Sequence, residues 1–532
     1  MNFILYSDVN DSSISQSLGR PEYSYYFVLK AYRAVLESLG RVHVVQSTAD
    51  VDPLYRQLLL EGEESLFLSF TPPHKAPTDL TCPTIGVVAW EFDSIPDEHW
   101  DNDPHQDWGR TLARHGRVIT LSTHTARAVH KALGEDFPVL VLPTPLWESF
   151  AGIRSQYPSA AINLGTTLHI KGCIIDSRGL GLCADGLIAP VIAEVEPEVN
   201  DVVIEAPPLT WRRRLFITKH YLRQCGLEVW RDTSGRRLII GKHYLVQWYR
   251  EALNDLVPER VQATAASLRR ARVLPVTEPE PESAHEHPQA VLPDTTELVE
   301  TQVDGVVYVS VFNPVDGRKN WHQLITAFCW AMRDVEDATL VLKMTQNDLS
   351  LYYVQMLTLL SQLSPFSCRV VVMHGFLDDE QYARLYGAAS FYVNASRCEG
   401  LCLPLMEFMA CGKPVLAPAH TAMEDYIDER VAFVIKSSQE PAIWPQDSRI
   451  LFRTRRHRPD WGSLRDAYQD SYRMAKEQPH TYQAMSDAAT ERMRDYCAFA
   501  PVQKRMADFF GLAPMTGGAI APTVAVADNA SC

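Results

Sequence analysis

Two glutamates in the C-terminal half of the chain lie at either end of a predicted loop-to-helix transition. The segment 398–415 reads CEGLCLPLMEFMACGKPV, and residues 390–393 before it predict a short buried strand. The apolar density of 403–410 predicts a helix that ends at Gly412. Glu399 therefore lies between a strand's C-terminal end and a helix N-terminus, where backbone N–H groups and the helix dipole favour an anion. Glu407 lies inside the predicted helix.

A second loop carries two adjacent cations. The segment 312–320 reads FNPVDGRKN and joins a predicted strand at 306–311 to a predicted helix at 321–333. Because both loops leave strand ends of one parallel sheet, we expect Arg318 and Lys319 to face the same crevice as Glu399. Cations at a helix N-terminus oppose the dipole, so we favour a functional role over a solvated helix start.

Length, composition and charge bound the class of protein. A chain of 532 residues with 46% hydrophobic and 22% charged content predicts two or three globular domains. The net charge of −15 argues against general binding to nucleic acid or anionic membranes, although a local basic patch is compatible with it.

The N-terminus predicts no signal peptide, and no stretch has the roughly 18 apolar residues of a membrane-spanning helix. Eleven cysteines without Cys-x-x-Cys pairs indicate reduced thiols. These features predict a cytoplasmic protein, with peripheral association at the inner face of the membrane left open.

Residues 1–150 predict an N-terminal α/β domain, because short apolar strands alternate with helices as in a doubly wound parallel sheet. Ligands bind beyond the C-terminal ends of such strands, which singles out the loops 8–19, 91–96 and 122–125. Glu91 and Asp93 lie in the second loop and could serve a ligand or cap the following turn. The predicted strands are 2–6, 41–46, 65–69, 84–90, 117–121 and 139–142, and the predicted helices are 25–39 and 125–133.

Residues 151–303 interrupt this alternation and predict an insertion of unknown role that ends in a Pro/Glu-rich linker. The sequence indicates β-structure at 160–175 and 202–204 and an amphipathic helix at 244–253. Pro, Glu and Thr dominate 274–298, which predicts an extended connector, and we assign the HEH at 285–287 to it. The tetrad KHYL occurs at 219–222 and 242–245. Two copies of four residues are too few to indicate a repeat architecture, so we interpret them as a coincidence.

Residues 304–498 predict a second α/β domain, with strands at 306–311, 339–343, 369–373 and 391–393. After Phe433 the sequence predicts helices to about residue 510, of which 499–512 is the final one. The Ala/Gly/Thr-rich tail at 513–532 predicts disorder.

The frame around the two glutamates resembles the retaining nucleotide-sugar glycosyltransferases of the GT-B fold, in the large Glu-x7-Glu family (glycosyltransferase family 4-like, "glycosyl transferases group 1"). That motif reads approximately Glu-Gly-Phe-Gly-Leu-Pro-x-x-Glu-Ala-Met-Ala-Cys-Gly-x-Pro-Val. Here Leu401, Cys402 and Phe408 stand in place of its Phe, second Gly and first Ala. The resemblance implies two Rossmann-like domains that face a cleft, with a final helix that packs back on the first.

The resemblance also implies roles at the sugar and ribose. Glu407 would accept hydrogen bonds from the ribose hydroxyls, and Glu399 would contact the transferred sugar and favour its oxocarbenium-like transition state. Backbone N–H groups of Gly400, Leu401 and Cys402 would serve the sugar and the β-phosphate. The family has Gly at the position of Cys402, and glycine allows a closer approach to the backbone than a residue with a side chain.

At the phosphates and the base, the correspondence is looser. Lys319 falls at the family's phosphate-binding Lys, Asn313 falls where the family has Arg, and Arg318 is the candidate substitute. Such cations stabilise the charge that a departing nucleoside diphosphate gathers. Gly375 and Phe376 fall where the family receives the base, with core packing as the alternative for Phe376.

The implied activity is retaining, hexosyl-type transfer from a nucleotide-sugar donor to a hydroxyl acceptor, a glycan or lipid-linked glycan, in polysaccharide or glycoconjugate biosynthesis. The donor would bind the second domain and the acceptor the first, beside Glu91 or Asp93. No metal or other cofactor is expected, because the Asp101-Asn102-Asp103 segment lies in a polar loop. The alternatives are a non-catalytic sugar-nucleotide-binding scaffold, a glycoside hydrolase that uses the two glutamates, and an epimerase.

Overall fold

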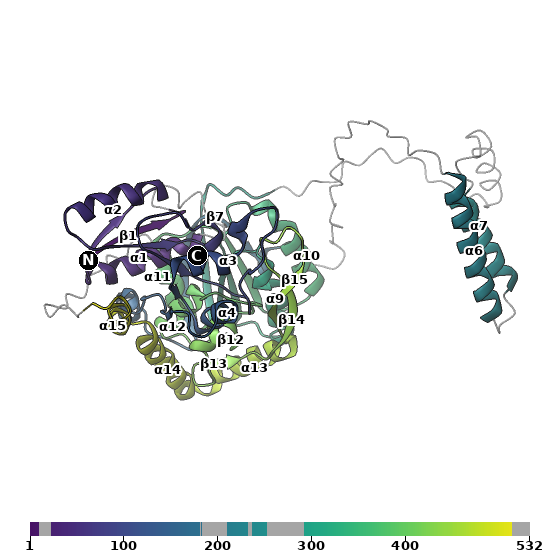
Figure 1. Ribbon diagram of the computed structural model, residues 1–532. Helices are drawn as coiled ribbons and strands as arrows, with labels where there is room; N and C mark the ends of the chain where they lie inside the picture. Colours follow the sequence, from purple (N-terminus) through teal and green to yellow (C-terminus); the bar gives the residue numbers. More distant parts are fainter. Residues whose placement is uncertain (10–22, 181, 183–209, 232–236, 253–291, 513–532) are drawn as a thin grey trace. The chain divides into compact units, whose positions relative to one another are not determined.

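The computed structural model describes residues 1–9, 23–180, 182, 210–231, 237–252 and 292–512 (Figure 1). The chain divides into two compact units, Met1–Pro190 with Leu292–Cys532, and Val191–Val291. Within the described residues, no helix is long and apolar enough to cross a membrane. The predicted tail at 513–532, strand at 202–204, most of the 8–19 loop and most of the 274–298 linker lie outside the described residues.

The first sheet of the larger unit has six parallel strands in the order β2-β1-β3-β4-β5-β6. Every residue of β3 is buried, as expected for a strand with helices on both faces of its sheet. The strands are β1 (Asn2–Ser7), β2 (Arg41–Val44), β3 (Ser65–Phe70), β4 (Thr84–Val88), β5 (Val118–Thr120) and β6 (Val139–Val141), and the longer helices are α1 (Tyr23–Glu37), α2 (Val51–Leu60), α3 (Trp108–His115) and α4 (Thr123–Leu133). Helices α2 and α3 were not predicted.

The second sheet has seven strands around a long central strand, β8 (Leu298–Phe312). The second half of β8 pairs in parallel with β9 (Ala338–Met344) and β11 (Phe391–Val393). The other elements are β10 (Arg369–Phe376), β12 (Val415–Ala417), β13 (Ala432–Val434), α9 (Trp321–Ala331), α10 (Tyr353–Leu363), α11 (Asp379–Ala388) and α12 (Leu403–Ala410).

Strand β7 (Asn163–Asp176) corrects the predicted division of the chain. It pairs antiparallel with the first half of β8 and with β10, so 163–176 and 298–303 belong to the second sheet and not to an insertion. Gly172 of β7 and Gly375 of β10 lie opposite each other in this antiparallel pair, and both have positive φ, at 155° and 129°. A Cβ on Gly172 would lie 2.0 Å from the His374 carbonyl oxygen, so only glycine allows this approach.

Residues 437–459 correct a second prediction, that of helices after Phe433. They contain β14 (Ser437–Ile443) and β15 (Phe452–Pro459), which pair antiparallel as a two-stranded ribbon. We call 437–459 the strap, because it reaches the first domain, as described below. Helices resume with α13 (Trp461–Glu477) and α14 (Pro479–Cys497).

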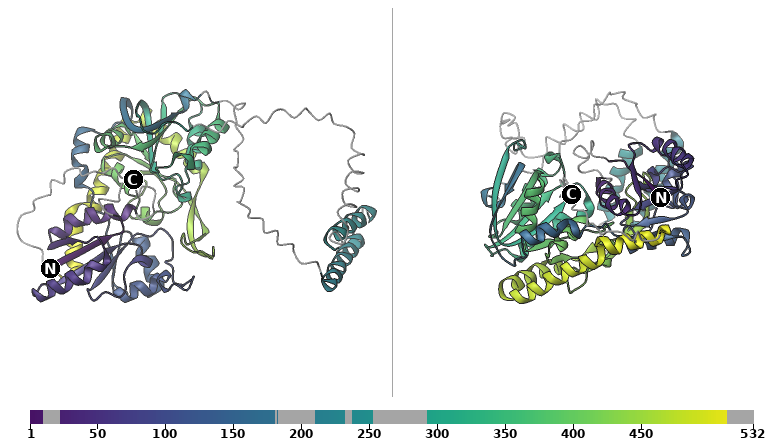
Figure 2. Two further views of the ribbon diagram at one scale, coloured as in Figure 1. Left: turned by 90° about the horizontal axis from the view of Figure 1, so that it is seen from above. Right: turned by 90° about the vertical axis from the view of Figure 1, so that its left-hand side faces the viewer.

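The last helix, α15 (Phe499–Phe510), returns to the first domain. The Phe510 ring lies 5.4 Å from that of Phe3, and Gln503 Nε2 donates to Ser38 Oγ at 2.7 Å. Figure 2 shows the yellow C-terminal helices passing along both domains. Two Rossmann-like sheets with this crossing helix form the GT-B fold, which confirms the predicted fold class.

The smaller unit contains two described helices, α6 (Trp211–Arg231) and α7 (Arg237–Ala252). They lie side by side (Figure 1). The sequence predicted the C-terminal part of α7 but not α6, whose first turn carries three consecutive arginines.

Candidate functional site

A cleft of about 680 Å³ lies where the C-terminal ends of the strands of both sheets meet. Tyr25 and Trp90 line it from the first domain, and Thr345 and Pro404 line it from the second. Eight residues predicted for the site line it as well: Glu91, Asn313, Arg318, Lys319, Glu399, Gly400, Leu401 and Cys402. The predicted residues Asp93, Gly375, Phe376 and Glu407 do not.

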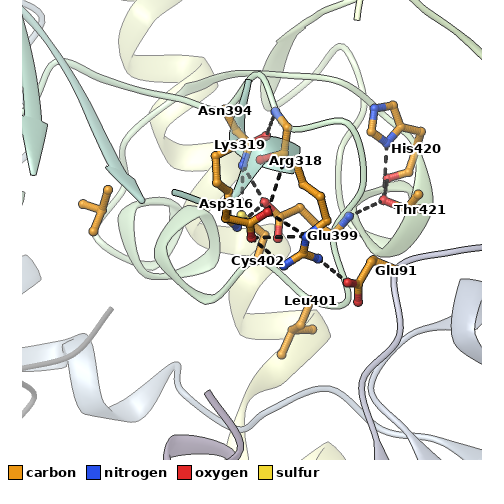
Figure 3. A network of polar contacts seen from close by, with 12 residues as sticks. Glu91, Asp316, Arg318, Lys319, Asn394, Glu399, Leu401, Cys402, His420 and Thr421 are labelled. Carbon is orange, nitrogen blue, oxygen red and sulfur yellow. Dashed lines mark hydrogen bonds and ion pairs between the residues drawn. The ribbon is translucent and has the colours of Figure 1, made fainter. Parts of the chain in front are cut away.

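Lys319 and Glu399 form an ion pair in this cleft. Asp316 caps the short 3₁₀ turn Gly317–Lys319, and this turn directs Lys319 Nζ to within 2.7 Å of Glu399 Oε1 (Figure 3). Burial would raise the pKa of Glu399, but Lys319 and Arg318 lower it below its usual range. Burial would lower the pKa of Lys319, but Glu399 and Asp316 raise it. Both groups are therefore charged at neutral pH.

Arg318 joins the two domains. Its guanidinium forms an ion pair with Glu91 of the first domain and a bidentate pair with Asp316 beside it, with Nη2 2.6 Å from Asp316 Oδ2 (Figure 3). Burial raises the pKa of Glu91, although Arg318 opposes this shift. Three carboxylates thus surround two cations in this described part of the cleft, and both cations are already paired.

The loop after Glu399 is shaped by its backbone. Cys402 has a left-handed conformation, with φ of 67°, which is strained for a residue with a Cβ. Asn394 Nδ2 lies 3.1 Å from Cys402 Sγ and 3.5 Å from Glu399 Oε1. Gly400 approaches the first domain closely, because a Cβ on it would lie 3.2 Å from the Trp90 backbone nitrogen. The Glu399 N–H donates to Thr421 Oγ1 at 3.1 Å.

Glu407 lies apart from this cluster. Its carboxylate accepts a hydrogen bond of 2.8 Å from the Tyr386 hydroxyl on α11. Burial raises the pKa of Glu407 to about 7, and the Tyr386 bond lowers it only in part. A glycosidase pair must flank one scissile bond, so the separation of Glu407 from the cleft argues against the hydrolase alternative.

The other predicted residues have structural partners. Asp93 accepts from Arg455 Nε and from the Arg455 N–H, each at 2.7 Å, and both donors belong to the strap. Gly375 is required by the close pairing of β7 and β10, since a Cβ there would lie 2.2 Å from the Lys171 carbonyl oxygen. The Phe376 side chain is 57% exposed at the end of β10.

Sequence reasoning missed four residues that organise the site: Asp316, Tyr386, Asn394 and Thr421. Asp316 has a recognisable signal, because an Asp-Gly pair before a helix predicts a cap. Asn394 follows a predicted strand directly, which is where a ligand-side residue is expected. Thr421 lies 22 residues beyond Glu399 in a turn with φ of 52°, and nothing in its sequence indicates the contact.

Three solved structures are similar to the chain, each at low sequence identity. The HepE protein of Anabaena in complex with UDP and glucose is 10% identical, with a TM-score of 0.44 over 96% of this chain and 99% of that one. A glycosyltransferase of Rickettsia africae is 8% identical, with a TM-score of 0.46 over 96% and 97%. Sucrose-phosphate synthase of Thermosynechococcus elongatus is 12% identical, with a TM-score of 0.43 over 96% and 98%.

Comparison with protein families is more specific. No curated protein is a significant match to the chain. Residues 304–445 match the model of the family described as glycosyl transferases group 1. The match spans β8 to the start of the strap, and it includes both the Arg318–Lys319 loop and the Glu399–Cys402 loop. The second Rossmann-like domain is therefore a member of the glycosyl transferases group 1 family.

Proposed function

We propose that the protein is a retaining glycosyltransferase that moves a hexosyl group from a nucleotide-sugar donor to a hydroxyl of a glycan or lipid-linked glycan. The observation that carries the proposal is the Lys319–Glu399 pair, buried in the cleft beside the N-terminus of α12. A cation, a carboxylate and a helix N-terminus together suit the diphosphate and the sugar hydroxyls of such a donor.

In the proposed reaction, the bond between the anomeric carbon and the diphosphate breaks, and its electron pair leaves with the phosphate oxygen. The acceptor oxygen attacks the same face, and its proton passes to that departing oxygen. Lys319 and Arg318 stabilise the charge on the diphosphate, most strongly in the transition state. No metal takes part in this scheme.

Donor binding would rearrange the Arg318 contacts. A phosphate oxygen would replace Glu91 on the guanidinium, since a phosphate is the stronger bidentate partner. Glu91 would then be free to orient the acceptor hydroxyl, with Asp93 left in its contact with the strap. Metal-free transfer with Glu91 on the acceptor side is thus part of the proposal.

The test is a panel of UDP-, GDP-, ADP- and dTDP-sugars without added metal, with thermal shift for binding and nucleoside diphosphate release for turnover. Lys319→Met should reduce release at least about 100-fold, which corresponds to a charged hydrogen bond of about 3 kcal/mol in the transition state. Lys319→Met also leaves the buried Glu399 without its ion-pair partner, so the double variant K319M/E399Q is the key comparison. The double variant should recover thermal stability but not release.

Lys476→Met is the matched control, because Lys476 on α13 forms an ion pair with Asp337, directly before β9, and neither residue lines the cleft. It should keep both donor binding and release. Binding of one donor without release, in the presence of a range of acceptors, would favour the scaffold alternative. The observation that supports this alternative is that Arg318 and Lys319 are both already paired with carboxylates of the chain. If no donor binds, the proposed site is wrong.

A further inference from the structure

Helices α6 and α7 pack through one face of each, and we call the pair the basic hairpin. Trp248 Nε1 donates to Thr218 Oγ1 at 2.9 Å, and the Tyr221 and Tyr244 rings lie 6.3 Å apart at an edge-to-face angle. The Arg214 guanidinium donates to the Ala252 carbonyl oxygen at the end of α7. These contacts define an inner face, and the remaining faces are exposed.

The KHYL repeat now has a structural explanation. The tyrosine of each copy, Tyr221 or Tyr244, turns inward to the other helix. The leucine of each copy turns outward, with the side chains of Leu222 and Leu245 69% and 61% exposed. Each leucine follows its lysine by three residues, so the lysine lies on the same side of the helix. The repeat thus places a cation beside an exposed apolar side chain on both helices.

Exposed apolar side chains are concentrated on the basic hairpin. Trp211, Leu215 and Leu222 recur at spacings of four and seven, which is one stripe of α6, and Phe216 and Trp230 lie beside it. On α7, Leu245 and Tyr249 form a second stripe. Seven of the twenty exposed large hydrophobic side chains among the described residues lie on these two helices, a density that marks an interaction surface.

The charge of this segment is opposite to that of the rest of the chain. Residues 211–252 contain ten Lys and Arg against three Asp and Glu, a net charge of +7 in a chain of −15. The remaining residues therefore carry −22. The chain's overall charge hides a strongly cationic segment, and only an anionic partner complements it.

We propose that the basic hairpin is a docking surface for an anionic lipid bilayer, on which it lies with its apolar stripes inserted between the headgroups. Tryptophans and leucines beside lysines and arginines are the composition of interfacial helices. Neither helix can span the bilayer, so the hairpin rests at its surface. The proposal concerns attachment only and does not depend on the transfer reaction.

Two other occupants fit less well. A second copy of the hairpin would bring +7 against +7, which opposes association. Single-stranded nucleic acid would use aromatic side chains for stacking, but the exposed leucines Leu215, Leu222 and Leu245 have no stacking role. Aliphatic insertion together with positive charge is the requirement of a lipid surface.

The test is flotation of the full-length protein with vesicles of phosphatidylcholine alone or mixed with phosphatidylglycerol. The protein should float only with the anionic vesicles, and added salt should release it. R212E/K219E/R223E should weaken binding at least about 100-fold, because each cation contributes about fivefold near an anionic surface. L215S/L222S/L245S should also lose binding while it keeps every charge.

The matched control is R465E/R473E/R494E, which makes the same charge change on α13 and α14, where these arginines pair only with neighbours on their own helices. It should float as the native protein does, and circular dichroism should show that all three variants are folded. Equal binding to neutral vesicles, or equal loss in the control, overturns the proposal. Vesicle binding that L215S/L222S/L245S retains also overturns it. So does a dimer of the native protein that this leucine variant abolishes, and so does displacement of the protein from anionic vesicles by single-stranded DNA at matched ionic strength.

Discussion

At the scale of single residues, the cleft is a balance of buried charges. Lys319 and Glu399 each lose hydration on burial, and the electrostatic attraction between them offsets that loss. Removal of either partner leaves the other charge buried and unpaired, which costs on the order of 3–5 kcal/mol. The same argument explains why Arg318 holds both Asp316 and Glu91. A ligand phosphate would enter such a site by replacing a carboxylate that is paired with one of the two cations, so the site needs no further buried cation.

Glu407 makes stability depend on pH. Below its ordinary pKa of 4.5 the carboxyl is protonated in both the folded and the unfolded chain, whereas above about 7 folding buries a charge. Its contribution to the free energy of unfolding is therefore present at low pH and lost as the pH rises through about 7. Glu407→Gln should thus gain stability over the native protein by about 2 kcal/mol between pH 5 and pH 8, as measured by denaturant unfolding.

Tyr386→Phe is the comparison for this prediction. It removes the hydrogen bond that lowers the pKa of Glu407 in the folded protein, so that pKa should rise. The loss of stability should then continue to a higher pH than in the native protein. If Glu407→Gln and the native protein differ equally at both pH values, the raised pKa of Glu407 is refuted.

At the scale of elements, the antiparallel pairing of β7 with β10 depends on two glycines, Gly172 and Gly375. Gly172→Ala should destabilise the second domain by about 3 kcal/mol or more, because the new Cβ meets the backbone oxygen of His374 and no side chain can move to relieve it. Thermal unfolding of the purified variant measures the loss.

Gly179→Ala serves as the control, since no atom lies within 4 Å of a Cβ built at Gly179. It should unfold within about a degree of the native protein, because exposed substitutions of this kind change stability by about 0.5 kcal/mol or less. A Gly172→Ala variant as stable as the control would mean that β7 and β10 do not pair this closely at Gly172.

Sequence reasoning found most strands of both sheets, because buried parallel strands are continuous apolar runs such as 306–311 and 339–343. It found β7 as a strand but not its partners, since an apolar pattern fixes which face is buried and not which strand lies beside it. The ribbon β14–β15 was missed because it is largely exposed and its sequence, rich in arginine, lacks alternation.

The site shows the same limit. Lys319 and Glu399 were predicted to face one crevice because both follow strand ends, and the structure brings them together. The commitment of Arg318 to Glu91 joins residues 227 positions apart in two domains, and local sequence carries no signal for it. For Asp93 the sequence left open a ligand contact or a cap of the following turn, and it carries no signal for the contact with Arg455 of the strap.

At the scale of the whole molecule, the strap connects the two domains beside the cleft. Arg449 Nη1 lies 2.7 Å from Glu98 Oε2, Arg455 pairs with Asp93, and the rings of Trp444 and Trp100 stack at 6.1 Å. Partly exposed pairs of this kind contribute about 0.2–1 kcal/mol each. Together they favour the closed arrangement of the domains.

Arg449→Ala with Arg455→Ala should shift the ratio of open to closed forms several-fold toward open, since the double change removes two of the ion pairs that join the strap to the first domain. Small-angle scattering should then show a larger radius of gyration, and a saturating donor should reduce it again. Arg465→Ala with Arg473→Ala removes the same charge from α13, where both pair locally, and should leave the scattering curve unchanged. An unchanged curve for the strap variant would show that its ion pairs do not hold the domains closed.

The return of α15 to the first domain also affects how the chain is made. Phe3 and its neighbour Phe510 are 507 positions apart, so Phe3 leaves the ribosome long before Phe510 does. The N-terminal sheet therefore emerges with part of its apolar surface uncovered, and that surface stays open until α15 has been synthesised. Strand β7 likewise waits for the more than one hundred residues that separate it from β8. Neither half of the nascent chain can therefore complete its core until these later segments have left the ribosome.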